Sequence, residues 1–237
     1  MSVKLELIGG VAVIGIDDGK VNALNLALLQ QINDALESAE ALNTGVVIIG
    51  RPGILSAGFD LKQMMTEDSV ACSLLRAGAE LCLRLMTFRR PVVSACTGHA
   101  YPMGAFLLLS SDYRIGADGP FKIGMNEAKI GLVMPTFAFE LARWRLTPPA
   151  FNKTILTGEM FTPNEAVSAG FLDEVCDANA LASVAISKAA ELSAMPANAH
   201  VQIKRKLRAP LLEAIRHAID TELTEDAFRA ARLAVAS

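Results

Sequence analysis

The pattern of apolar and polar residues changes twice within residues 1–50. The segments VKLELI and VAVIGID alternate in the manner of strands and flank Gly9 and Gly10, which predicts a two-stranded hairpin. Leucine and isoleucine at helical spacing then predict a helix over residues 26–42, with Asn25 as its capping residue. The wholly apolar run GVVIIG that follows predicts a short strand covered on both faces.

Strand and helix patterns continue to alternate up to Pro135. An amphipathic period predicts a helix over residues 67–88, PVVSACTG and GAFLLLSS predict a buried strand and a buried helix, and YRIGA and FKIG predict short strands. Beyond Pro135 the pattern is helical apart from FLDEVC, and it includes a helix predicted over residues 211–235. We therefore expect a layered α/β core in residues 1–178 and a helical C-terminal region in residues 179–237.

Composition and charge exclude several classes of function. The 237 residues are 52% apolar, enough to bury a full core, and their net charge of −3 gives no broad basic surface for nucleic acid. The basic run at residues 204–208 is interpreted as a solvated helix face. Four cysteines without C-x-x-C spacing indicate free, mostly buried thiols and a reducing compartment. The first residues lack the continuous apolar stretch of a signal peptide, so we expect a cytoplasmic protein.

One stretch, residues 91–111, contains no charged side chain and invites a membrane interpretation. Prolines and glycines interrupt it, whereas a spanning helix needs ~20 predominantly apolar residues in succession. A strand, a turn and a buried helix are favoured, and no membrane association is expected.

Common catalytic signatures are absent from the sequence. There is no G-x-G-x-x-G, no G-x-x-x-x-G-K-[ST] and no G-x-S-x-G, and the three histidines are too far apart for metal-ligand spacing. A glycosidase with paired carboxylates is weakly supported, because no two carboxylates stand together in apolar turns. We expect no metal site.

Two turns between a strand and a helix do indicate chemistry, SAGFD and GHAYPMGAF. Each is built of small residues and opens a helix, whose first N–H groups lack internal partners. Side by side they would aim two N–H groups at one point, as in an oxyanion hole. The alternative is that Gly58 and Gly104 only permit tight turns. Glu127 lies in a third, otherwise apolar segment, where a carboxylate is costly unless it is used or is paired with Lys122 or Lys129.

These segments, together with LTGEMFTPNEAVSAGFLDEVC, resemble the enoyl-CoA hydratase/isomerase (crotonase) superfamily, in collinear order from about Lys20 to Cys176. The resemblance implies a crotonase-like α/β core of strand–strand–helix units. It also implies an acyl-CoA thioester substrate, whose coenzyme A is part of the substrate and not a cofactor. Homotrimers or dimers of trimers are implied as well, with the C-terminal region serving oligomerisation and covering the active site.

The resemblance also implies residue roles. The backbone N–H groups of Phe59 and Met103 would stabilise a thioester enolate, and Glu127 would move the proton. The coenzyme A pocket would include Lys20, Val21, Ala23, Ala57, Asp60 and Leu61.

The second turn departs from the hydratases that it resembles. Hydratases carry a glutamate where this chain has Phe106, so one of their two catalytic carboxylates is missing, while Glu127 is retained. A single carboxylate suffices to move a proton from C2 to C4, so the sequence resembles the Δ3,Δ2-enoyl-CoA isomerases most. The alternatives are a hydratase that activates water with Glu127 alone and an acyl-CoA binding protein without turnover.

Overall fold

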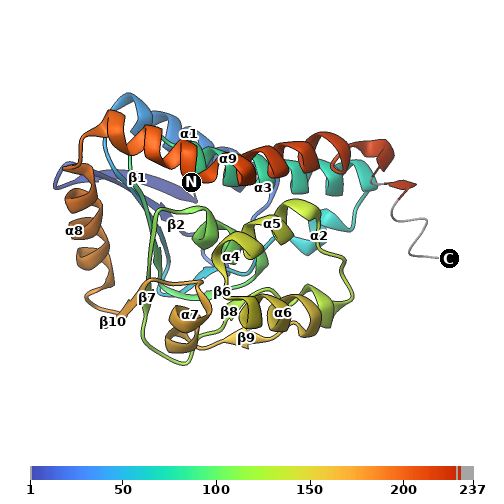
Figure 1. Ribbon diagram of the computed structural model, residues 1–237. Helices are drawn as coiled ribbons and strands as arrows, with labels where there is room; N and C mark the ends of the chain where they lie inside the picture. The colour runs from blue at the N-terminus through green and yellow to red at the C-terminus, as the bar shows by residue number, and fades with distance from the viewer. Residues whose placement is uncertain (1, 228, 231–237) are drawn as a thin grey trace.

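The main sheet of the protein has six strands in the order β1-β2-β3-β5-β7-β10 (Figure 1). The computed structural model describes residues 2–227, 229 and 230. The hairpin pairs β1 and β2 antiparallel, and the other neighbours are parallel. The strands span Val3–Ile8, Val11–Ile16, Val46–Gly50, Val92–Cys96, Tyr113–Ala117 and Glu174–Cys176.

Helices cover both faces of this sheet, as the apolar β3 predicts. Helix α8 (Leu181–Ser193) packs on one face, and α1 (Leu26–Ala41) and α3 (Asp68–Thr87) contribute to the core on the other. Asn25 caps α1 as predicted, because its Oδ1 accepts a hydrogen bond of 2.8 Å from the Leu28 N–H. The hairpin, the strands predicted at GVVIIG, PVVSACTG and YRIGA, and the layered α/β core are confirmed.

A second, smaller sheet was not expected from the sequence, although its strand at FKIG was predicted. It contains β4 (Gly53–Ser56), β6 (Gly98–Ala100), β8 (Ile123–Gly124) and β9 (Met160–Phe161) in that order. The first three strands are parallel, and β9 is antiparallel to β8. These strands have two to four residues each, too few to show an alternating pattern.

Close backbone contact between β4 and β6 depends on glycine. A Cβ at Gly98 would lie 2.0 Å from the Gly53 carbonyl oxygen, so a side chain there would separate the strands.

Helix α4 (Pro102–Ser110) follows β6 and is buried from Met103 onward. The uncharged stretch that includes it is therefore a strand, a short strand where a turn was predicted, and a buried helix. Among the described residues, no helix combines the length and the apolar character needed to cross a membrane. Cys72, Cys82 and Cys96 are buried free thiols, and Cys176 is a half-buried one, in agreement with the expectation.

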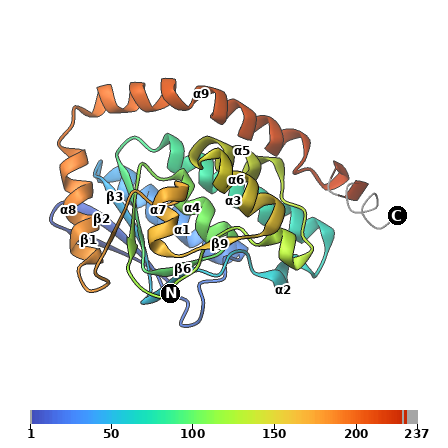
Figure 2. The same ribbon diagram turned by 60° about the horizontal axis from the view of Figure 1, so that its bottom comes forward.

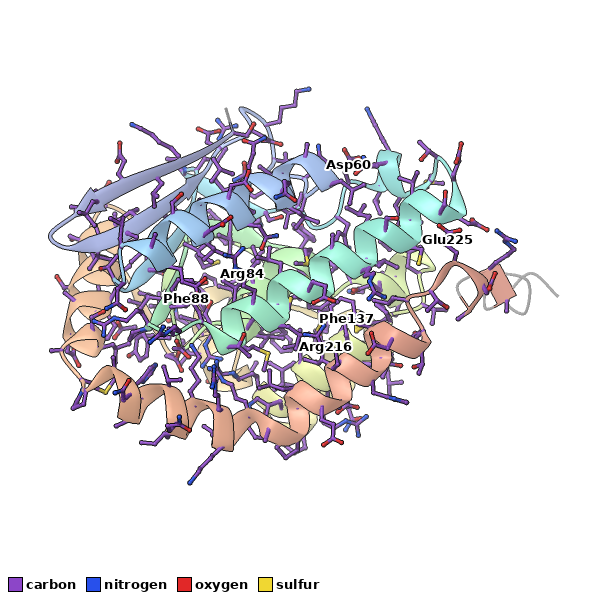
Figure 3. All side chains as sticks on the ribbon, turned by 90° about the horizontal axis from the view of Figure 1, so that it is seen from above. Asp60, Arg84, Phe88, Phe137, Arg216 and Glu225 are labelled. Atoms are coloured by element: carbon purple, nitrogen blue, oxygen red, sulfur yellow. The ribbon has the colours of Figure 1, made fainter. Side chains whose placement is uncertain are left out.

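The second half of the chain is mainly helical. It contains α5 (Thr136–Arg145), α6 (Pro148–Thr157), α7 (Pro163–Ala169) and α9 (Ala197–Thr221), in addition to α8. One further short helix, α2 (Leu61–Met64), belongs to the first half of the chain. Helix α9 crosses the molecule above α5 (Figure 2) and runs beside α3 (Figure 3), where Arg216 pairs with Glu80 at 3.0 Å. The division into residues 1–178 and 179–237 stays a prediction.

The predicted boundary of the last helix is wrong. Pro210 was expected to precede the helix, but it lies inside α9. Proline removes one backbone hydrogen bond, and at this exposed position water can satisfy the carbonyl that is left free. Of the predicted range 211–235, residues 228 and 231–235 lie outside the described residues.

Candidate active site

The three candidate catalytic residues follow three neighbouring parallel strands. Ser56 of β4 is in register with Ala100 of β6, which is in register with Ile123 of β8. Phe59, Met103 and Glu127 come three, three and four residues after these positions. Because the carboxyl ends of parallel strands meet at one edge of a sheet, the second sheet brings the three segments together.

The KVNALN and SAGFD segments lie side by side. The Ala57 N–H donates to the Val21 carbonyl at 2.9 Å, and the Leu24 N–H donates to the Gly58 carbonyl at 2.8 Å. The Asp60 N–H returns a bond of 3.0 Å to the Leu24 carbonyl. These contacts bring together two segments that the sequence analysis assigned to one pocket.

The first turn also touches the start of α4. Gly58 has a φ of +95°, and a Cβ there would lie 3.7 Å from the Met103 nitrogen. A Cβ at Gly104 would lie 3.0 Å from the Ser56 carbonyl oxygen, so Gly104 lets α4 approach the end of β4. Both glycines therefore serve the meeting of the two turns.

The backbone N–H groups of Phe59 and Met103 are available for a ligand. In the part of the chain that the structure describes, neither donates a hydrogen bond to the backbone or to a side chain. Met103 lies in the first turn of α4, where helical N–H groups have no internal acceptor and the helix dipole favours negative charge. The arrangement can stabilise an oxyanion.

Helix α3 supports the side chains of these two residues. Gly78 faces them: a Cβ there would lie 2.4 Å from Cζ of Phe59 and 3.2 Å from Sδ of Met103. The absence of a side chain at Gly78 therefore makes room for both.

Glu127 is a buried carboxylate without a cationic partner. The residue begins a 3-10 turn (Glu127–Ile130) and is 8% exposed, and its Oε2 has no hydrogen-bond partner among the described residues. Burial raises the pKa of Glu127 to about 7, against a smaller lowering from its own backbone N–H. Lys122 and Lys129 are exposed, and within the described residues Glu127 forms no ion pair. The alternative of a salt-bridged structural glutamate is wrong.

Asn22 holds the KVNALN segment in place, a role that was not predicted from the sequence. Asn22 is fully buried with a φ of +52°. Its Nδ2 donates to the carbonyls of Ile16 and Leu55 at 2.8 and 3.1 Å, and its own carbonyl accepts from Ser56 Oγ at 2.7 Å. The signal available was an asparagine in an apolar segment, a residue type that tolerates the left-handed conformation.

Thr154 of α6 is the second residue missed. Its buried hydroxyl contacts both the N–H and the carbonyl of Met125 at 3.3 Å, two residues before Glu127. No pattern in the sequence distinguishes this threonine from its neighbours.

The predicted coenzyme A residues differ in exposure. Lys20, Val21 and Leu61 are exposed, whereas Ala23, Ala57 and Asp60 are half-buried. Asp60 caps α2, since its Oδ1 accepts from the Lys62 N–H at 2.9 Å. The Lys20 N–H donates to the Asp18 carboxylate, and the Lys20 carbonyl accepts from Arg51. These bonds hold the backbone of Lys20 in a turn, and its side chain is exposed.

The interpretation of the basic run at residues 204–208 needs correction. Arg205 and Lys206 are exposed as expected, but Lys204 and Arg208 are buried and bond the Asp112 carboxylate at 2.7 and 2.8 Å. Helical spacing of four residues places these two on the inner face of α9. Both side chains form ion pairs with Asp112 inside the protein, so they do not form a phosphate-binding site.

Comparison with known proteins identifies the family. A protein-family model described as enoyl-CoA hydratase/isomerase matches residues 6–231 of this chain. The chain belongs to this family. A crystal structure of an enoyl-CoA hydratase/isomerase family protein from Pseudomonas syringae has a TM-score of 0.92 and 43% identity, covering 94% of this chain and 96% of that one. The fold is therefore the crotonase fold.

Curated relatives include both isomerases and hydratases. Mitochondrial enoyl-CoA delta isomerase 1 from Homo sapiens is 32% identical over 204 residues, covering 84% of this chain and 68% of the relative. The 2,3-dehydroadipyl-CoA hydratase of Escherichia coli K12 is 29% identical over 175 residues, covering 73% of this chain and 68% of the relative. The chain is an enzyme of the enoyl-CoA hydratase/isomerase type acting on acyl-CoA.

Within this family, Phe106 is the informative departure. It lies one helical turn after Met103 in α4, is 1% exposed, and packs edge-on against Phe137 of α5 with the ring centroids 5.6 Å apart. An apolar pair occupies the space where the resemblance places the first glutamate of hydratases.

Proposed function

We propose that this protein is a Δ3,Δ2-enoyl-CoA isomerase that uses Glu127 as its single proton shuttle. The observation that carries the proposal is the lone buried carboxylate of Glu127, unpaired at Oε2 and with a pKa raised by burial to about 7. Such a group changes protonation state near neutral pH, so it can act as base and then as acid in one turnover.

The proposed reaction has two proton transfers. The Glu127 carboxylate takes a proton from C2 of a 3-enoyl thioester, and the electron pair moves to the thioester oxygen as an enolate. The N–H groups of Phe59 and Met103 donate hydrogen bonds to that oxygen, each worth ~3 kcal/mol in the transition state. The protonated Glu127 then delivers the proton to C4, and the double bond ends between C2 and C3.

Phe106 supports the isomerase over the hydratase. Its buried ring and that of Phe137 leave α4 without the carboxylate that would help hold an attacking water. An apolar site also protects the enolate from unwanted protonation by solvent. The similarity to the human delta isomerase favours the same reaction.

The second candidate is a hydratase that acts on 2-enoyl-CoA with Glu127 as the only water-activating group. The observation that favours it is the similarity to the Escherichia coli hydratase. A non-catalytic acyl-CoA binding protein is disfavoured by the retained carboxylate, which opposes folding when ionised and has no structural partner.

The coenzyme A moiety is proposed to lie along the paired KVNALN and SAGFD segments. Backbone groups near Val21, Ala23, Ala57, Asp60 and Leu61 would contact it, and Lys20 would lie near a phosphate. The exposed position of Lys20 suits such a contact, because a lysine is a mobile point charge.

Turnover of two substrates, measured side by side, tests the proposal. The protein is expected to convert 3-enoyl-CoA to 2-enoyl-CoA and to add water to 2-enoyl-CoA much more slowly. Rapid hydration of 2-enoyl-CoA with no conversion of 3-enoyl-CoA would establish the hydratase instead. Binding of both substrates without either reaction would leave the non-catalytic alternative.

A further inference from the structure

A half-buried arginine binds the far end of the helix that carries Met103. Arg145 of α5 donates from Nε to the Leu109 carbonyl at 3.1 Å and from Nη2 to the Ser111 carbonyl at 2.6 Å. These carbonyls belong to the last turn and the C-cap of α4, whose first turn contains Met103. Nine residues of helix, about 13 Å, separate the two ends.

The surroundings of α4 make this contact electrostatically significant. Every residue of the helix from Met103 to Ser110 is buried, so water screens it weakly. A cation at a helix C-terminus interacts favourably with the helix dipole, whose positive end here lies at Met103. The charge on Arg145 therefore acts along the axis that leads to the proposed oxyanion site.

Arg145 is also not neutralised by a carboxylate of its own. Among the described residues, Asp112 pairs with Lys204 and Arg208, and Asp173 pairs with Arg114. Within the described residues, Arg145 forms no ion pair and its hydrogen bonds go to carbonyls alone. Burial lowers the pKa of Arg145 to about 9, which leaves the guanidinium protonated at neutral pH.

The groups around Arg145 add to its effect. Within the described residues, Arg145 and Lys204 lie in one cluster of interacting charged groups. The cluster includes four cations, two of which are Arg145 and Lys204, and two carboxylates. The members of this cluster are Arg114, Arg145, Lys204, Arg208, Asp112 and Asp173. A positive excess therefore lies behind the C-terminal end of α4.

We propose that Arg145 is a positioning residue of the oxyanion site. It fixes the C-terminal end of α4, keeps the Met103 N–H aimed at the thioester oxygen, and adds positive potential along the helix at that oxygen. This role rests on the proposed function, because it requires an acyl-CoA thioester at the Met103 N–H. Arg145 itself does not touch the substrate.

The test measures the thioester carbonyl directly. A saturated acyl-CoA with a ¹³C-labelled carbonyl is bound to the enzyme, and the isotope-edited infrared stretch reports how strongly the oxygen is polarised. Wild type should lower the stretching frequency relative to free acyl-CoA. Arg145→Gln should lose part of this shift, whereas Arg145→Lys, which keeps the charge, should retain most of it.

Turnover provides the second readout. A charge removed at about 13–15 Å in a weakly screened environment should lower the kcat of Arg145→Gln roughly five- to tenfold and leave KM unchanged. The matched control is Arg76→Gln. Arg76 likewise donates to carbonyls near the end of a helix, those of Ile219 and Leu223, but that helix is α9, and Arg76 also pairs with Asp220 at 3.7 Å. The control should lose thermal stability without a change in the carbonyl frequency.

Two results would overturn the role of Arg145. One is a folded Arg145→Gln that keeps the full infrared shift; the other is a loss of shift in Arg76→Gln as large as in Arg145→Gln. If the glutamine variant does not fold, Arg145→Met replaces it, because methionine fills the space without a buried amide. Failure of wild type to bind acyl-CoA, or to shift its carbonyl, would contradict the proposed function instead.

Discussion

Glu127 opposes folding whenever its carboxyl group is ionised. It is buried in the folded protein and pairs with no cation of the described residues, and its pKa is raised there from 4.5 to about 7. An acid whose folded pKa lies above its unfolded pKa binds protons more tightly in the native state. The free energy of unfolding therefore falls as pH rises from about 4.5 to about 7. Above that range, the destabilisation by the ionised Glu127 carboxylate is fully present.

The replacement Glu127→Gln should remove this dependence. At pH 8 the variant is expected to be more stable than wild type, by on the order of 3 kcal/mol, because the wild-type charge is buried and unpaired. At pH 4.5 the two proteins should differ little, since Glu127 is then protonated. Thermal unfolding at both pH values checks this, and an equal difference at the two pH values would contradict the raised pKa.

At the scale of single elements, α3 and α4 hold the two turns in place. The helix interior at Gly78 has no side chain, and the ring of Phe59 and the sulfur of Met103 lie in that space. On an exposed helix face, Gly→Ala stabilises by up to ~1 kcal/mol. At Gly78 the sign should reverse, because the added Cβ would lie 2.4 Å from the Phe59 ring.

We therefore expect Gly78→Ala to lower both thermal stability and isomerase turnover. The added methyl group forces Phe59 and Met103 to move, and misplaced N–H donors lose transition-state stabilisation. Steady-state kinetics and thermal unfolding of the variant measure the two effects. A variant that is more stable than wild type and fully active would show that this contact is not needed.

Buried ion pairs with Asp112 hold helix α9 against the rest of the protein. Lys204 and Arg208 reach the Asp112 carboxylate, and the Lys204 ammonium also donates to the Phe88 carbonyl at 3.1 Å. Despite the attraction of Asp112, burial lowers the pKa of Lys204 to about 8. The helix thus depends on an ion pair that is exposed to little water.

Lys204→Met should destabilise the protein by about 3 kcal/mol, because it removes one partner from a buried charge pair. The matched control is Lys206→Met on the same helix, where the side chain is exposed and the expected change is within about 0.5 kcal/mol. Denaturant unfolding of both variants gives the comparison. Equal effects would mean that the Asp112 contacts contribute nothing particular.

The elements that sequence predicted best are those with a repeated pattern. The hairpin, α1 and α3 have clear periods, and Asn25 marks the start of α1. Apart from the strand at FKIG, the second sheet was missed because its strands are too short to show a repeated pattern. That sheet is nevertheless what brings Phe59, Met103 and Glu127 to one edge, a geometry that the motif resemblance does not explain.

The sequence also did not predict which charged side chains pair with one another. Lys204 and Arg208 have the composition of a solvated run, and only the packing of α9 shows that they face Asp112. Likewise, the absence of a partner for Glu127 depends on where Lys122 and Lys129 point, which local sequence does not specify.

At the scale of the whole molecule, α9 covers its own core. Leu211, Ile215 and Ile219 are buried against the same chain, so this part of the apolar face of α9 is already covered. Ile203 and Leu207 remain 65% and 61% exposed on the same helix. Together with the resemblance, they keep the homotrimer or dimer of trimers as a prediction.

Light scattering should therefore give a mass that is a multiple of 25.2 kDa, with three or six chains per particle at micromolar concentration. Apolar surface on α9 would provide part of the association free energy. A strict monomer at that concentration would contradict the prediction.

The central claim is that one carboxylate carries the proton, and the rate of 3-enoyl-CoA isomerisation by Glu127→Gln tests it most directly. Glutamine keeps the shape of the side chain but cannot accept the C2 proton. General acid–base groups contribute roughly 10²–10⁴-fold, and one residue here serves both transfers, so the rate should fall by about 10⁴-fold or more. Acyl-CoA binding should remain, because the N–H groups of Phe59 and Met103 are unchanged. A variant that keeps most of the wild-type rate would show that the proton travels through another residue.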